Sequence, residues 1–165
     1  MPVLEYHPDR ADGDLKEMLA TEAAERIKKL FSDKKIAPKI LDIGTGRGLF
    51  VSECLKEGFD VYGLDIAKRY EGDKSRLTIV DARFLPFRDK SFDMVFQHLF
   101  FEDMTDLQHL RENEVLLTVN EIHRILKQNG FVYSFHSQFI LGDKMENRFK
   151  NIIKYSQFEN IYIKI

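Results

Sequence analysis

The chain has 165 residues, the size of one domain, and its 25 basic and 27 acidic residues give a formal net charge of −2. Because Lys and Arg are scattered among Asp and Glu, neither nucleic acid nor an anionic membrane is expected as a partner. The single cysteine, Cys54, excludes an internal disulfide, and no apolar run approaches the ~20 residues of a membrane span. The N-terminus, Met1–Arg10, has no signal-peptide pattern. We therefore expect a cytoplasmic protein.

The predicted elements fall into three regions of a single domain, residues 1–165. Residues 1–37 form an N-terminal extension with one helix, at about Asp14–Phe31, where apolar residues recur at helical spacing. Residues 38–136 alternate apolar strands with helical segments, which predicts a parallel sheet with helices on both faces. Residues 137–165 hold a helix near Lys144–Tyr155 and an apolar end. The strands of the middle region are expected at about 39–43, 60–65, 76–80, 92–97 and 131–136, and its helices at Leu49–Glu57 and about Glu112–Lys127.

A glycine-rich turn between the first predicted strand and the following helix is the most informative motif. Gly44, Gly46 and Gly48 allow a tight turn and let a ligand approach bare backbone at a helix start. The spacing is G-x-G-x-G, and Leu49 stands where the third glycine of a dinucleotide fingerprint would fall. Asp42, two residues before the first glycine, suits a ligand with a positive group better than a pyrophosphate. Both features disfavour a nicotinamide-dependent oxidoreductase.

With Asp42 included, this turn resembles the acid-x-G-x-G-x-G motif of the class I S-adenosylmethionine (SAM)-dependent methyltransferases. Three later segments agree with it in order. Asp60–Ile66 is a short strand that ends in an acid, Leu85–Val95 resembles the LPF-x-D-x-SFD-x-V segment of the small type 11 family, and Glu121–Gly130 resembles that family's E-x-x-R-x-L-K-P-G-G helix end. Gln128 and Asn129 replace Pro and Gly there, and Asn tolerates left-handed turn geometry. The resemblance covers about residues 38–136.

The resemblance implies an α/β fold with a Rossmann-like, doubly wound, mostly parallel sheet in the strand order 3-2-1-4-5. Such a sheet normally closes with an antiparallel hairpin, but Asn160–Ile165 supplies only one strand before the chain ends. We therefore expect the C-terminal hairpin to be shortened. Ile161, Ile163 and Ile165 make one side of this segment apolar, and a bare edge strand of that kind invites pairing. Either a homodimer partner covers it or it is the remnant of a hairpin.

The resemblance also assigns a SAM site. Asp42 and the Gly44–Gly48 loop would hold the methionine and ribose parts, and Asp65, 17 residues after Gly48, would bind the ribose hydroxyls or else cap the next turn. Asp81 would accept from the adenine amino group, or be an ordinary strand-end acid. Phe84, Leu85 and Phe87 are expected to pack in the protein, unless one of them stacks on the adenine. The predicted cofactor-binding set is Asp42, Gly44, Thr45, Gly46, Gly48, Asp65, Ile66, Asp81, Ala82 and Gln97.

Two histidines follow neighbouring predicted strands. His98 comes after the fourth strand and His136 ends the fifth, so both imidazoles could face the same crevice as a general base, or both could be structural. The histidines lack the close spacing of a metal site, and no metal is expected. Cys54 and Met94 are interpreted as core residues.

These observations favour an enzyme that transfers a methyl group from SAM to a small-molecule acceptor. The acceptor class rests on the lack of an Asn-Pro-Pro-Tyr signature, which amino-methylating nucleic-acid enzymes carry. The alternative is a methyltransferase-like module that binds SAM or a partner without catalysis. The complete set of glycines and acids favours the enzyme, and the short C-terminus favours the module.

Overall fold

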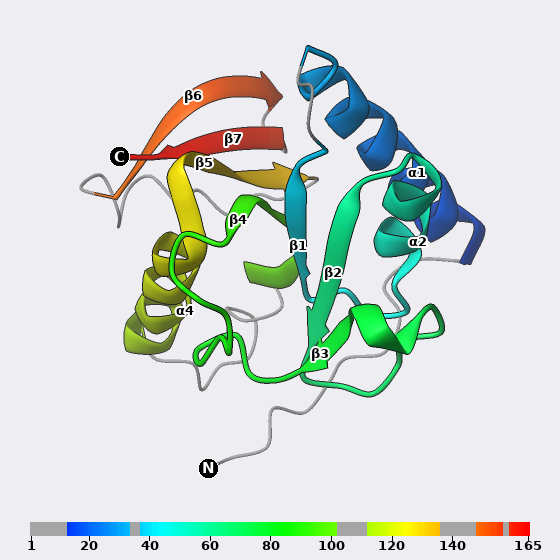
Figure 1. Cartoon of the computed structure of the whole chain (residues 1–165), viewed down its shortest axis with the longest axis horizontal. Coiled ribbons are helices and arrows are strands. Elements are labelled where there is room, and N and C mark those ends of the chain that lie inside the picture. Colours follow the sequence, from blue (N-terminus) through cyan, green and yellow to red (C-terminus); the bar gives the residue numbers. More distant parts are fainter. Residues whose placement is uncertain (1–12, 34–36, 102–111, 136–147, 157–158) are drawn as a thin grey trace.

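The computed structural model describes residues 13–33, 37–101, 112–135, 148–156 and 159–165, and within them seven strands form one sheet (Figure 1). The strands are β1 (Lys39–Ile43), β2 (Asp60–Asp65), β3 (Leu77–Ile79), β4 (Phe92–His98), β5 (Leu126–Phe135), β6 (Phe149–Ser156) and β7 (Glu159–Lys164). The helices are α1 (Gly13–Leu30), α2 (Leu49–Lys56), the short 3₁₀ helix η1 (Lys74–Arg76) and α4 (Glu112–Ile125).

The strand order is β3-β2-β1-β4-β5-β7-β6, which confirms the predicted order 3-2-1-4-5 and the Rossmann-like class. The first five strands pair in parallel, and β7 pairs antiparallel with both β5 and β6. The predicted strands agree with the structure within a residue, except that β5 begins at Leu126. Leu126 pairs with Phe92 ahead of a bulge, so α4 ends at Ile125, two residues earlier than expected.

The predicted helix near Lys144–Tyr155 is wrong over the part that the structure describes. Residues 149–156 form strand β6, which pairs with β7. This stretch is rich in β-branched and aromatic residue types, which favour a pleated strand over a helix. The remainder of that predicted helix, residues 144–147, lies outside the described residues.

The expectation that the hairpin lacks a strand is also wrong, because β6 and β7 together form it. The prediction that Ile161–Ile165 is not a bare edge is confirmed, since β7 lies between β5 and β6. Ile161 and Tyr162 are buried. The cover comes from β6 of the same chain, so the edge strand no longer argues for a homodimer.

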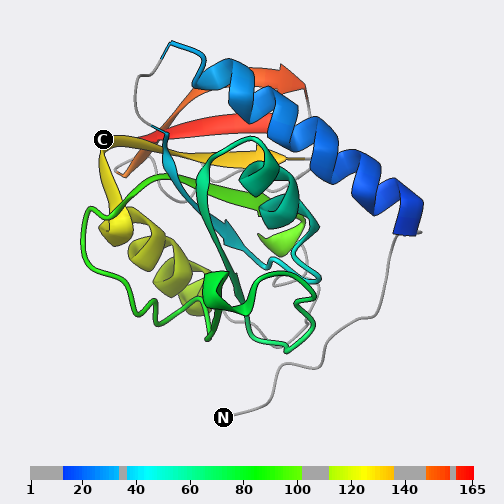
Figure 2. The same ribbon diagram turned by 45° about the vertical axis from the view of Figure 1, so that its right-hand side comes forward.

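Two helical layers cover the sheet, as the two views in Figures 1 and 2 show. Alternate residues of each strand point to opposite faces. Leu41, Ile43 and Val95 pack with α4 in one core cluster, and Ile40, Met94 and Phe96 pack with α1 and α2 in the other. Each such side chain contributes about 1.5–3 kcal/mol when fully buried. Met94 and Cys54 are both core residues, as predicted.

Among the residues that the structure describes, no helix is both long and apolar enough to cross a bilayer.

Candidate functional site

The carboxyl ends of the parallel strands meet at one edge of the sheet. Ile43 of β1 pairs with Leu64 of β2 on one side and Gln97 of β4 on the other. The chain runs from β1 outward to β2 and β3, and then returns to β4 on the opposite side of β1. This reversal is the position where open α/β sheets bind ligands. The glycine turn after β1, Asp65 at the end of β2 and His98 at the end of β4 all lie at this edge.

The three glycines of the turn serve different purposes. All have left-handed φ values, +75° at Gly44, +53° at Gly46 and +81° at Gly48. A Cβ on Gly48 would stand 2.1 Å from the ring of Tyr70, so this position is needed for packing. A Cβ on Gly46 would meet no atom within 4 Å. Gly46 therefore exposes its backbone to open space, as a ligand-contacting glycine must.

Asp65 joins the end of β2 to the glycine turn. Its Oδ2 accepts a hydrogen bond from the Gly46 N–H at 2.8 Å, and its Oδ1 accepts from the Ala67 N–H at 2.8 Å. The second bond is the turn-capping role that the sequence left open. Because an ionised carboxylate has about four acceptor positions, each oxygen keeps capacity for one further donor such as a hydroxyl.

Asp42 lies in β1, two residues before the same turn, and its side chain is buried, with the residue 4% exposed. Burial raises its pKa to about 7, and the charge of Asp65 acts in the same direction. The neighbouring Thr45 hydroxyl acts in the opposite direction. That hydroxyl is itself buried without a partner of hydrogen-bond geometry in the described chain. A positive group brought near Asp42 would favour its ionised form, so the site suits a cationic ligand.

A second part of the edge follows β3. The Val80 N–H donates to the Asp65 carbonyl at 3.0 Å, which brings Ile66 and Asp81 to neighbouring positions. Ala82 is buried, whereas Ile66 and Phe84 are unusual among large apolar side chains in being 48% and 54% exposed. Exposed apolar side chains beside an acid can provide a surface for a flat, apolar base. Leu85 and Phe87 belong to the core cluster or pack against it, as predicted.

Asp81 already has a partner inside the protein. Both of its carboxylate oxygens accept hydrogen bonds from the guanidinium of Arg83, whose Nε lies 3.0 Å from Oδ1 and 2.9 Å from Oδ2. The Arg83 backbone N–H also donates to Oδ1, at 2.9 Å. Burial alone would raise the pKa of Asp81, but the bonds and charge of Arg83 outweigh it and hold the pKa below its usual value.

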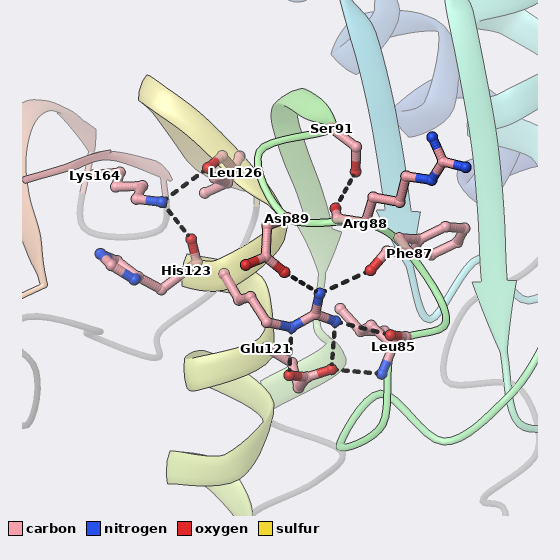
Figure 3. A network of polar contacts seen from close by, with 10 residues as sticks. Leu85, Phe87, Arg88, Asp89, Ser91, Glu121, His123, Leu126 and Lys164 are labelled. Carbon is pink, nitrogen blue, oxygen red and sulfur yellow. Dashed lines mark hydrogen bonds and ion pairs between the residues drawn. The ribbon is translucent and has the colours of Figure 1, made fainter.

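A network of polar contacts fixes the loop from Leu85 to Ser91 to α4 (Figure 3). Arg124 uses all five of its N–H groups: they reach Glu121 twice, Asp89, and the carbonyls of Leu85 and Phe87, at 2.7–2.8 Å. Glu121 also accepts from the Leu85 N–H at 2.8 Å. The two sequence segments that resemble the type 11 family therefore contact each other. Together they fix the loop that follows Asp81 and Ala82.

The end of β4 is less open than the sequence suggested. Gln97 is 1% exposed, its Nε2 donates to the Ser134 hydroxyl, and its Oε1 accepts from the Phe100 N–H at 3.1 Å. A contact between Gln97 and a ligand stays a prediction. His98 is half-buried, with its ring 5.9 Å from that of Phe135, its partner in β5. His136 lies outside the described residues, so a joint role of the two histidines also stays a prediction.

Arg83 and Tyr70 were missed by sequence reasoning. Arg83 sits directly after the Asp81-Ala82 pair, and an arginine two residues after an acid could have been considered as its partner. No sequence pattern singles out Tyr70, because its role is to pack against Gly48 in the folded protein. Among the residues that the structure describes, no group of three or more His, Cys, Asp or Glu side chains could hold a metal ion.

Known proteins resemble this chain in sequence. The chain is 32% identical over 123 residues to "Arginine-hydroxylase NDUFAF5, mitochondrial" of Mus musculus, covering 70% of this chain and 33% of that protein. It is 30% identical over 97 residues to "Malonyl-[acyl-carrier protein] O-methyltransferase 1" of Coxiella burnetii, covering 56% and 31%. The chain thus spans about a third of the length of these relatives.

Solved structures share the fold. The PH0226 protein of Pyrococcus horikoshii OT3 superposes with a TM-score of 0.63 at 20% identity, covering 94% of this chain and 92% of that one. A SAM-dependent methyltransferase of Archaeoglobus fulgidus has a TM-score of 0.53 at 23% identity, covering 72% and 55%. The family model described as "Methyltransferase domain" matches residues 41–134, from β1 to the end of β5. The chain therefore belongs to the type 11 family of methyltransferase domains.

Proposed function

We propose that the protein binds SAM at the carboxyl edge of the sheet and transfers its methyl group to a small-molecule acceptor. One observation carries the proposal: the bare backbone of Gly46 faces open space and is bonded to Asp65, whose charge acts on the buried carboxyl of Asp42. This combination offers room, hydroxyl-binding capacity and a preference for positive charge. SAM matches these three properties of the site: it needs room at the turn, its ribose has hydroxyls to bind, and its sulfonium and ammonium groups are positive.

Each part of the site has a role in this proposal. Asp42 and the glycine turn hold the methionine and ribose portions, and Asp65 uses its free acceptor positions for the ribose hydroxyls. Asp81 and the Ala82 backbone face the adenine. The exposed side chains of Ile66 and Phe84 supply apolar surface for the two faces of the base.

The chemistry asks the protein mainly for orientation. SAM supplies an already activated methyl group when bound, and the protein must align the acceptor with it, which is a matter of proximity. The residues at the end of β4 are placed for that role, because β4 is the strand next to β1 on the side away from β2. If the acceptor is an O–H or N–H group, His98 or His136 would take its proton.

Two relatives of this chain are named for different reactions, so the reaction needs a direct test. One is called an arginine hydroxylase and another an O-methyltransferase, and the chain spans only a third of either. A module that binds SAM without catalysis remains the competing function. Product formation with a panel of acceptors, followed by mass spectrometry for a 14-dalton gain (roughly one CH₂), separates the two. A cytoplasmic location and a homodimer also stay predictions, to be checked by cell fractionation and light scattering.

The binding site itself is tested by calorimetric titration with S-adenosylhomocysteine and NAD. Gly46→Val places a side chain in the open space over the turn and should abolish binding of S-adenosylhomocysteine. Gly58→Val is a matched control, because Gly58 also has a left-handed φ of +80° and open space around its Cβ, but follows α2 at the opposite edge. Equal affinity of the two variants, or preference for NAD, would contradict the proposal.

A further inference from the structure

The carboxylate of Asp81 already accepts three N–H groups of Arg83. Its Oδ1 accepts from the backbone N–H, its Oδ2 accepts from the Nη2–H, and the two oxygens share the single Nε–H. A carboxylate offers about four acceptor positions. A further donor must therefore take the one position left beside the bonds to Arg83, or replace one of those bonds.

The guanidinium of Arg83 is held from a second side. Its Nη1 donates to Glu114 of α4 at 2.7 Å, and the Arg83 side chain is only 13% exposed. The other oxygen of Glu114 is buried and has no hydrogen-bond partner within the described residues. Glu114 can therefore accept a second bond from the guanidinium when Arg83 releases Asp81, which gives the arginine an alternative position.

We propose that Arg83 determines the affinity and base selectivity of the cofactor site by competing with the amino group of the purine for Asp81. The inference rests on the proposed function, since it takes Asp81 as the acid that faces the base. With Arg83 in place, an amino group must share a carboxylate that already accepts three N–H groups and is paired with a guanidinium. Without Arg83, the same amino group finds a free carboxylate. Arg83 is thus a specificity-determining residue that weakens recognition of the 6-amino group.

The test combines a change in the protein with a change in the ligand. Arg83→Gln is titrated with S-adenosylhomocysteine and with an analogue whose base is unsubstituted purine, which lacks the amino group. We expect the variant to bind S-adenosylhomocysteine roughly fivefold more tightly than the parent, as for the loss of one part-exposed ion pair, and to bind the purine analogue with unchanged affinity. Arg83→Lys keeps the charge but not the paired donors, so its affinity for S-adenosylhomocysteine should lie between those of the parent and Arg83→Gln.

Arg76→Gln is the matched control. Arg76 also bonds a carboxylate, Asp60, at 2.6 Å, and is 29% exposed, but it precedes β3 at the far edge of the sheet. It should change neither affinity. If Arg83→Gln binds S-adenosylhomocysteine no more tightly than the parent, or gains equally for both ligands, competition for the amino group is refuted. A parent protein that binds neither ligand would instead refute the proposed function and this inference with it.

Discussion

Replacement of Arg124 by Met tests whether the contact between the two family-like segments stabilises the fold. The change removes five hydrogen bonds, three to carboxylate oxygens and two to backbone carbonyls. At about 1 kcal/mol net for each bond, and discounted because the side chain is 31% exposed, the expected loss is about 3 kcal/mol of unfolding free energy. For a domain of this size that corresponds to a fall in Tm of roughly 6–12 °C.

The assay is urea and thermal unfolding followed by far-ultraviolet circular dichroism. Lys127→Met is the matched control, because Lys127 makes one ion pair with Asp93 at 2.9 Å and is 46% exposed. We expect this control to lose less than about 1 kcal/mol. Arg124→Lys keeps the charge but cannot form the planar fork, so it should lose an intermediate amount. If Arg124→Met and Lys127→Met unfold at the same midpoint, the network in Figure 3 does not stabilise the protein as argued.

Three further predictions concern the glycine turn and its acids. Gly48→Ala puts a Cβ 2.1 Å from a tyrosine ring and should lower stability by about 2 kcal/mol more than Gly58→Ala, which shares only the left-handed φ; equal thermal midpoints would contradict this. Asp42 has a folded pKa of about 7 against an ordinary value of 3.8, so the native state binds the proton more tightly and the parent loses stability as pH rises from about 4 to about 7. Asp42→Asn should therefore gain unfolding free energy relative to the parent from pH 5 to pH 8, and a pH-independent difference would refute the assignment. Asp65→Ala should weaken binding of S-adenosylhomocysteine by about 1.5–3 kcal/mol, whereas Asp73→Ala, which removes another carboxylate that caps a turn, should not; an unchanged dissociation constant would reduce Asp65 to a turn residue.

The parallel part of the fold could be predicted because its signals are local. The glycine turn after Ile43 and the acid at Asp65 mark strand ends directly. Asn129 has the left-handed φ, +62°, that the sequence led us to expect, but it lies inside β5, at the irregularity in its pairing with β4, and not in a turn before the strand. The hairpin could not be predicted in the same way. Residues 149–156 pair with β7, which begins three residues after β6 ends, and this pairing with another segment leaves no motif in the residues of β6 themselves.

In the candidate site, too, some features could be predicted from the sequence and others could not. The positions of Asp42, Asp65 and Asp81 at the strand ends followed from the sequence pattern. Their partners did not: the bond from Gly46 to Asp65 and the ion pair of Arg83 with Asp81 are properties of the folded loops. Gln97 was predicted as a ligand contact from its position in the strand, whereas its side chain bonds Ser134 of the neighbouring strand. The position of a residue in the sequence therefore indicates where its side chain lies, but not which group that side chain bonds.

The most direct test of the SAM site is an amide NMR titration of the labelled protein with S-adenosylhomocysteine, observed at the glycines. The amides of Gly44, Gly46 and Gly48 should shift together and saturate at one dissociation constant, because they belong to the turn that contacts the ligand. The amides of Gly58 and Gly130 should not shift, because Gly58 precedes β2 and Gly130 lies in the first half of β5, beside the start of β4, away from the carboxyl ends of the strands. Saturable shifts confined to Gly58 and Gly130, or no shift at any glycine up to millimolar ligand, would contradict a SAM site at the carboxyl ends of the strands.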